Sequence, residues 1–426
     1  MKVKDTLYAI LLALNVFLLL SGMHSSVITL TLIFSSLLLV LHNPLALVPL
    51  MYVTAITSKF VVLPNIAGYF YYIILFVIGS VIKYQQFSVK GVSSWGIFTL
   101  LYIVWLIISS SNSISGSFEL VSRMMVAIIP IFFISIFEYK DNGSLPIYML
   151  VSAITLSTYV LLKLHIAPEW YIASADSDIS LMNLLNAQIT ISEDLNPNTL
   201  AQSLLIAYII TYTIAINWKK WWLLLFTILP ITSMIIIGSR TVFITMLIIS
   251  IFALLFSIKR SILWKVIAIA AVVICLTSIL KHAESINERL DIETIVEDDG
   301  SGRFDTWHSL IKNVVPLYPV AGVGYGRVNL SKLGYSVDAD NMYIDALSQI
   351  GIVGLMLLLV MIFCYFKMLW RMQDITSRIA VSLLFAILVV GFGETVFDTY
   401  IFTFVLFCAV LAKKTTQNIE IDPSND

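Results

Sequence analysis

Apolar runs recur from one end of the sequence to the other, and each is about as long as a bilayer crossing. A hydrocarbon core about 30 Å thick needs roughly 20 apolar residues in a helix, which satisfies its own backbone hydrogen bonds. Only 12% of the 426 residues are charged and 59% are apolar, too little polar surface to cover a soluble globule. We therefore predict an all-α integral membrane protein.

The runs predict a polytopic bundle of about 14 transmembrane helices. They cover residues 5–22, 26–41, 44–63, 66–84, 93–110, 118–137, 146–166, 198–217, 221–238, 240–258, 264–281, 342–366, 378–394 and 399–412. The first run lacks a small-residue cleavage site, so we expect a retained helix and not a signal peptide. Residues 1–414 are expected to form one membrane domain, and residues 415–426 a disordered cytoplasmic tail.

Basic residues set the predicted orientation. With a cytoplasmic amino terminus, every cytoplasmic turn except the one at His42-Asn43 carries lysine or arginine, as the positive-inside rule requires. Both termini then face the cytoplasm, and two long loops, about 167–197 and 282–341, lie on the outer face. Five of the eight arginines lie at or beyond the outer boundary, against the usual bias: Arg123, Arg240, Arg289, Arg303 and Arg327.

Placing an arginine near the hydrocarbon core costs free energy, so these residues need an anionic or hydrogen-bonding partner. A guanidinium is a planar fork that grips phosphate oxygens through two hydrogen bonds at once. Convergence at the outer leaflet would create a site for a lipid-linked phosphate or pyrophosphate, lined by Arg123, Arg240, Arg303 and Arg327. The alternative is pairing with lipid headgroups or with local acids, such as Glu119, Asp305, Glu394 or Asp398.

The second outer loop contains a predicted amphipathic helix and a glycine run. Ser301 or Gly302 can cap a helix that begins at Arg303 and ends before Pro316 and Pro319. Its expected apolar face, against the outer membrane boundary or the bundle top, consists of Phe304, Trp307, Ile311 and Val314. The glycines at 321–326 lie outside any βαβ unit, which disfavours a dinucleotide site. A sharp turn is the favoured role, and anion binding by backbone N–H groups the alternative.

His308 and Asp340 are the candidate general bases of this loop. Histidine suits that role without tuning, and a carboxylate suits it when its pKa is raised. His308 could instead pack locally, and Asp340 and Asn341 could cap the next helix. Further candidates are the carboxylates Asp338 and Asp345, and the residues expected to contact sugars or orient other side chains: Asn341, Tyr343, Glu394 and Asp398. No cluster has metal-ligand spacing, so we predict no metal and no cofactor.

Four segments in the last 40% or so of the chain resemble the O-antigen ligase/polymerase superfamily. They are GSRT at 238–241, SGRFDTW at 301–307, AGVGYG at 321–326 and DNMYIDALSQIGIVG at 340–354. The resemblance implies a metal-independent enzyme of the bacterial plasma membrane whose periplasm-facing site transfers undecaprenyl-diphosphate-linked glycans. Its fold would be similar to GT-C-type glycosyltransferases. Arg240 and Arg303 would bind the pyrophosphates, with Arg327 a further candidate.

One departure from the family pattern bears on the subclass. Many members, the ligases above all, have His-Asn or His-Ser where this chain has Asp340-Asn341. This favours a Wzy-type O-antigen or capsule polymerase over a ligase that acts on lipid A core, and it leaves the base unassigned. A lipid-linked-oligosaccharide flippase is the alternative of another class, although it needs no long outer loop. The expected partners are the lipid-linked oligosaccharide and membrane lipid, without nucleic acid, and binding of a chain-length regulator is left open.

Overall fold

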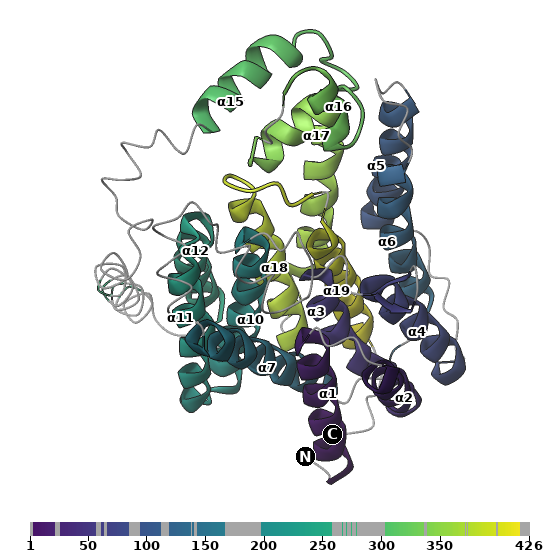
Figure 1. Ribbon diagram of the computed structural model, residues 1–426, viewed down its shortest axis with the longest axis vertical. Helices are drawn as coiled ribbons and strands as arrows, with labels where there is room; N and C mark the ends of the chain where they lie inside the picture. Colours follow the sequence, from purple (N-terminus) through teal and green to yellow (C-terminus); the bar gives the residue numbers. More distant parts are fainter. Residues whose placement is uncertain are drawn as a thin grey trace. The chain divides into compact units, whose positions relative to one another are not determined.

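In the computed structural model the chain is almost entirely helical (Figure 1). The structure describes residues 3–21, 26–56, 61–63, 66–84, 94–111, 119–137, 143–166, 197–257, 303–335, 339–370, 374–397 and 399–417, with a few isolated positions besides. The chain divides into two compact units. One comprises Met1–Gln86 with Tyr139–Leu290, and the other Phe87–Glu138 with Asp291–Asp426.

The first unit is built around the helix α10. Its helices are α1 (Val3–Ser21), α2 (Ser26–His42), η1 (Pro44–Leu47), α3 (Val48–Ile56), α4 (Gly68–Lys83), α7 (Ser144–Ile166), α10 (Pro197–Trp218), η2 (Trp221–Thr227), α11 (Ile228–Ile237) and α12 (Arg240–Ser257). Helix α10 packs against α7, α11 and α12, and 94% of its apolar window is buried. The buried Tyr208 and Ser250 hydroxyls hydrogen-bond at 2.6 Å and join α10 to α12.

The second unit contains the short helices of the 303–335 segment and the last apolar helices. Its elements are α5 (Ser94–Ser111), α6 (Glu119–Ile136), α15 (Arg303–Ser309), the π-helical turn η4 (Leu310–Val314), α16 (Arg327–Lys332), α17 (Met342–Trp370), α18 (Ile375–Val390) and α19 (Tyr400–Gln417). Helix α17 packs against α5 and α18, and α19 packs against α18 and α6. Helix α19 continues past Lys414, where the expected tail begins.

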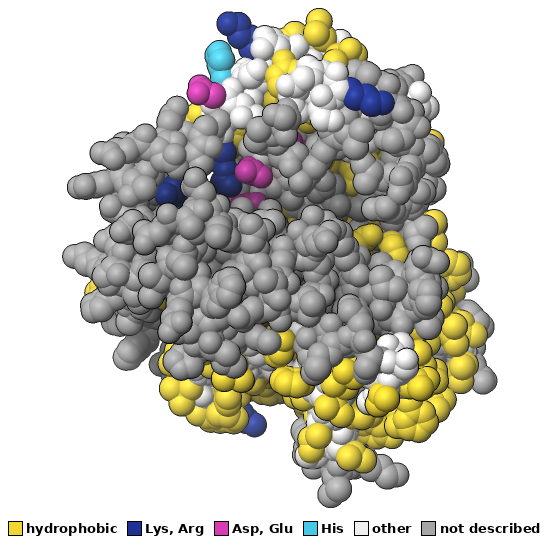
Figure 2. All heavy atoms as spheres, in the orientation of Figure 1, with side chains coloured by type: hydrophobic (Ala, Val, Ile, Leu, Met, Phe, Trp, Pro, Cys, Tyr) yellow, Lys and Arg dark blue, Asp and Glu magenta, His cyan; other side chains and the backbone are white. Residues whose placement is uncertain are grey.

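The helices overlap the predicted apolar runs, with a difference at residues 44–63, and residues 264–281 lie outside the described part of the chain except for isolated positions. Within the described ranges, four helices are long and apolar enough to cross a membrane, namely Ser94–Ser111, Ser144–Leu162, Asn198–Trp218 and Met342–Trp370, and further apolar helices are shorter. Hydrophobic side chains also cover the surface around α1 and α2 (Figure 2); Leu7 is 63% exposed and Val27 is 72% exposed. Such a surface fits contact with lipid. The prediction of a helical membrane protein is confirmed, and about 14 crossings stay a prediction.

The predicted helix at 44–63 is wrong at its carboxyl end. Helix α3 ends at Ile56, and Val61–Leu63 forms the strand β1, which pairs antiparallel with β2 (Ile66–Ala67). Pro64 disfavours the helical conformation for the residue before it, and β-branched valines fit an extended backbone. The apolar run therefore continues through a hairpin, which hydropathy does not distinguish from a helix.

Helix α17 breaks at Gly351, where the backbone adopts φ 68° and ψ −177°. The glycine run lies against this break and pairs with it in a strand-like way. The backbone N–H groups of Val323 and Gly324 donate to the carbonyls of Ser348 and Gln349 at 3.0 and 2.9 Å. Backbone carbonyls of a membrane helix thus keep partners where the helix is interrupted.

The backbone of the glycine run and the backbone of α17 cross at this break so closely that there is no room for side chains. A Cβ on Gly351 would lie 2.1 Å from the Val320 carbonyl oxygen, and a Cβ on Gly322 would lie 2.4 Å from the backbone of Gln349. Trp105 of α5 donates its indole N–H to the Ile350 carbonyl at 2.9 Å. The favoured role of the glycine run, a sharp turn, is confirmed, and close packing on α17 is an additional reason for glycine.

Candidate functional site

The first turn of α17 is capped by Asn341. Its side-chain oxygen accepts hydrogen bonds from the backbone N–H groups of Tyr343 and Ile344 at 3.0 and 3.1 Å, as an N-cap residue does. Its Nδ2 donates to the Phe392 carbonyl at 3.1 Å. The capping alternative is therefore confirmed for Asn341. The oxygen and the nitrogen of its side chain both form hydrogen bonds to the protein backbone. Asn341 therefore orients the amino-terminal end of α17, which we call the head of α17.

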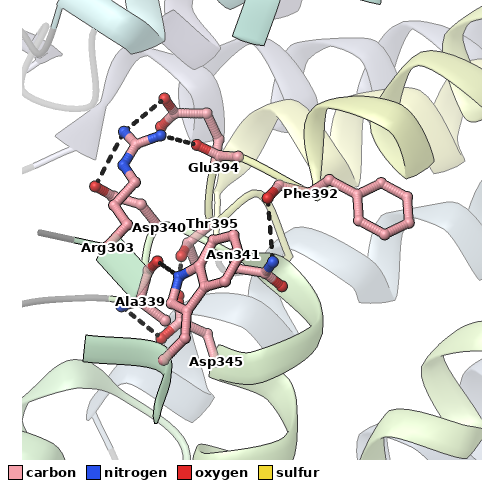
Figure 3. A network of polar contacts seen from close by, with 10 residues as sticks. Arg303, Ala339, Asp340, Asn341, Asp345, Phe392, Glu394 and Thr395 are labelled. Carbon is pink, nitrogen blue, oxygen red and sulfur yellow. Dashed lines mark hydrogen bonds and ion pairs between the residues drawn. The ribbon is translucent and has the colours of Figure 1, made fainter. Parts of the chain in front are cut away.

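Arg303 joins three segments of the second unit at this point (Figure 3). Its Nη2 lies 3.2 Å from Asp340 Oδ2 and 3.6 Å from Glu394 Oε1, and its Nη1 donates to the Gly393 carbonyl at 3.0 Å. Pairing with Glu394, the alternative to phosphate binding, is thus present for Arg303. The Glu394 side chain is 7% exposed, whereas the Asp340 side chain is 35% exposed. Asp340 is therefore the more accessible of the two acids.

Asp340 occupies an unusual backbone conformation, with φ 47°. Left-handed φ is uncommon outside glycine, asparagine and aspartate, and such conformations persist where their surroundings hold them. The preceding residue, Ala339, is held by hydrogen bonds at both its backbone N–H and its carbonyl. The Trp307 indole N–H donates to the Ala339 carbonyl, and the Ala339 N–H donates to Asp345 Oδ1 at 3.3 Å. The carboxylate of Asp340 is thus presented from a fixed backbone.

Helix α15 carries Arg303 and begins at the predicted residue, and its two aromatic side chains, Phe304 and Trp307, lie together with ring centroids 5.1 Å apart. The Val315 N–H donates to the Leu310 carbonyl at 3.1 Å, which is the wider π-helical spacing and rotates the residues that follow. Leu310 and Val314 are buried, with Trp307 packed against them, whereas Phe304 and Ile311 are about half exposed. Trp307 and Val314 therefore pack together as predicted, whereas contact of the exposed Phe304 and Ile311 with the membrane boundary stays a prediction.

Charged side chains gather over α15 and η4 in the second unit (Figure 2). Asp305, His308 and Lys312 are exposed there. His308 lies on the last turn of α15, and its ring is open to solvent. The Tyr343 hydroxyl donates to the Leu388 carbonyl at 2.6 Å, so this predicted sugar-contacting residue also serves to orient α17.

The structure places the remaining predicted site residues on separate elements. Arg240 is the half-buried first residue of α12 in the first unit. Arg327 begins α16, and Arg123 lies within α6; the side chains of both fall outside what the structure describes, as do Asp338 and Asp398. Convergence of the four arginines therefore stays a prediction.

The network includes Thr395, which the sequence did not point to, and a contact of Trp307 that was not predicted. Thr395 donates its hydroxyl to Asp345 Oδ2, and Trp307, predicted only as an apolar residue, donates to the backbone before Asp340. Asp345 is completely buried. A carboxylate within an apolar run was the available signal, because a buried carboxylate needs donors nearby.

The described side chains at Arg303 comprise one cation and two carboxylates, an excess of one negative charge if all are ionised. Such a set can accept a proton at the accessible carboxylate of Asp340. A bound diphosphate would require further cations, because like charges repel at this range. The arrangement thus suits activation of a hydroxyl, with anion binding completed by other basic groups.

A family model described as O-antigen ligase matches residues 223–359. The matched region runs from η2 through most of α17 and contains Arg240, Arg303, Arg327 and Asp340. No curated protein matches the chain. Over this region, about a third of the chain, which contains Arg303 and the head of α17, the protein is similar to the O-antigen ligase family.

Proposed function

We propose that this protein is a polysaccharide polymerase of the O-antigen or capsule type. Members of the family are glycosyl-transferring enzymes that act on lipid-linked oligosaccharides in membranes. In the proposed reaction, a growing glycan leaves undecaprenyl diphosphate and joins a sugar hydroxyl of the next undecaprenyl-diphosphate-linked repeat unit. The site would face the periplasm from the bacterial plasma membrane, with both termini in the cytoplasm.

The observation that carries this proposal is the presentation of Asp340. An acceptor hydroxyl must lose its proton to a base within hydrogen-bond reach. The Asp340 side chain is 35% exposed, its backbone is held at φ 47°, and its carboxylate is oriented by Arg303. We assign Asp340 as the general base and the buried Glu394 as the anchor that keeps Arg303 in place.

The proposed step is an inverting displacement. The acceptor oxygen attacks the anomeric carbon of the glycan while its proton passes to Asp340, and the bond from that carbon to the diphosphate oxygen breaks. The diphosphate leaves with the bonding electron pair, so charge develops on its oxygen. Cations directed at that charge lower the barrier.

Arginines are the proposed diphosphate ligands. A guanidinium has five N–H donors, so Arg303 can hold Asp340 and Glu394 and still donate to a phosphate oxygen. The negative excess around Arg303 requires additional positive charge, which we assign to Arg327 and Arg123 of the same unit; Arg240 is kept from the sequence as a further diphosphate ligand. In this proposal no metal ion is needed to neutralise the leaving group.

The match of residues 223–359 to the O-antigen ligase family supports a second candidate, transfer of the glycan to lipid A core. Asp340, at the position where ligases of the family carry histidine, favours the polymerase. Both candidates use the same donor and differ in the acceptor, so one assay separates them.

The deciding experiment supplies purified protein with undecaprenyl-diphosphate-linked repeat units, without nucleotide or metal. A ladder of lengthening lipid-linked products supports the polymerase. Transfer only after lipid A core is added would instead support the ligase. Translocation of unchanged substrate across vesicles, with no glycosidic bond formed, would exclude both enzymes in favour of a flippase.

A further inference from the structure

The second unit contains a buried carboxylate that the proposed chemistry does not use. Asp345 lies in the first turn of α17 and is 0% exposed. Its Oδ1 accepts the Ala339 N–H at 3.3 Å, and its Oδ2 accepts the Thr395 hydroxyl (Figure 3). Burial keeps this carboxylate away from a sugar hydroxyl, so it cannot itself serve as the base.

The partners of Asp345 are chain neighbours of the two acids held by Arg303. Ala339 directly precedes Asp340, and Thr395 directly follows Glu394. Arg303 therefore draws the two acids together through their side chains, while Asp345 joins their neighbours. These contacts close a ring that runs through α15, the head of α17 and the loop between α18 and α19.

The ring fixes the conformation that presents Asp340. The backbone of Ala339 is held on both sides of its Cα, because its N–H donates to Asp345 and its carbonyl accepts from Trp307. Rotation of this backbone would change the direction of the Asp340 side chain. A hydrogen bond to a charged group is stronger than one between neutral groups, which suits a carboxylate to this task.

We propose that Asp345 and Thr395 are positioning residues for the catalytic carboxylate. They keep the segments that carry Asp340 and Glu394 close enough together for Arg303 to contact both carboxylates. They act on the reaction only through Asp340. The inference rests on the proposed role of Asp340 as base. It predicts that loosening the ring lowers kcat, while donor binding, assigned to the arginines, stays unchanged.

The test is a set of substitutions at Thr395, measured as initial rates of chain growth in the full-length protein. Thr395→Val removes the hydroxyl with little change in shape and should lower kcat by about tenfold or more, since small displacements of a catalytic group have effects of this size. KM for the lipid-linked donor should not change. Thr395→Ser, which keeps the hydroxyl, should restore kcat.

Thr403→Val is the matched control. Thr403 is equally buried in the same unit, and its hydroxyl donates to the Tyr400 carbonyl at 2.9 Å, within α19. This variant should keep the wild-type kcat. Equal losses of kcat in Thr395→Val and Thr403→Val would overturn the inference, because they would show a general effect of losing a buried hydroxyl.

Substitutions at Asp345 provide a graded second measurement. Asp345→Asn keeps an oxygen that can accept the Ala339 N–H, whereas Asp345→Ala removes both interactions, so kcat should fall further in the alanine variant. Wild-type kcat in Thr395→Val and both Asp345 variants, with Asp340→Asn inactive, would contradict the positioning role alone. Wild-type kcat in Asp340→Asn would instead contradict the proposed function.

Discussion

Arg303 Nη2 lies 3.2 Å from Asp340 Oδ2, which joins α15 to the residue that precedes the cap of α17. Arg303 lies in the segment SGRFDTW and Asp340 in the segment DNMYIDALSQIGIVG. In the sequence these are two separate segments. Their contact makes them one site, with Glu394 as the buried third member. The guanidinium therefore has an orienting role in addition to any role in anion binding.

Arg303→Ala should lower the rate of chain growth by about a hundredfold or more, because it removes both the orientation of Asp340 and a donor to the leaving group. Arg303→Lys should not restore the rate, since an ammonium lacks the planar fork. The rate of product-ladder formation measures both effects. Lys312→Ala is the control, because Lys312 is an exposed cation on the adjoining η4. Wild-type ladders from Arg303→Ala would refute an essential role for this arginine.

Loss of Arg303 should also destabilise the second unit, because Glu394 would remain buried without this cation. Breaking a fully buried ion pair costs about 3–5 kcal/mol, and the cost should be smaller here because Arg303 is 27% exposed. Adding Glu394→Gln to Arg303→Ala should recover thermal stability and leave activity low. A double variant no more stable than Arg303→Ala would show that the pair contributes little to folding.

Gly351→Ala should lower the free energy of unfolding by more than about 2 kcal/mol, since the new Cβ would meet the Val320 carbonyl at 2.1 Å as well as strain a φ of +68°. Gly334→Ala measures the cost of the backbone strain alone, without a steric clash. Its φ is +88° and nothing lies within 4 Å of its Cβ, so it should cost about 1 kcal/mol. Thermal unfolding and the yield of folded protein measure the difference. Equal losses in both variants would contradict the close crossing.

Arg240→Ala should abolish chain growth while the protein is still made and inserted in the membrane. The reason is the proposed contact with the leaving diphosphate, which Asp340 and Glu394 cannot provide. A binding measurement with the lipid-linked donor should show weaker affinity. Normal chain lengths in this variant would remove Arg240 from the proposed site.

The sequence predicted the helices well, because bilayer-length apolar runs leave few alternatives to a helix. The start of α12 at Arg240 and of α15 at Arg303 agreed with the predicted residues. The hairpin at Val61–Leu63 was missed, because an apolar run has the same hydropathy in a strand and in a helix.

The sequence predicted which residues belong to the site better than it predicted the contacts between them. Arg303, Asp340, Asn341 and Glu394 were all candidates, yet their pairing depends on residues far apart in sequence that folding brings together. The π-helical turn at Leu310–Val314 also escaped prediction, since it changes the register without a distinctive residue pattern. Thr395 gave no signal, because threonine is ordinary in membrane helices and their ends, and Trp307 was predicted for its apolar face but not for its hydrogen bond to Ala339.

The most direct test of the account is the initial rate of chain growth by Asp340→Asn, measured with purified protein and undecaprenyl-diphosphate-linked repeat units. Asparagine tolerates left-handed φ and has nearly the same shape as aspartate, so the variant removes the base and preserves the backbone. The account predicts a folded protein that binds the donor and forms no ladder. A ladder formed at the wild-type rate would contradict it.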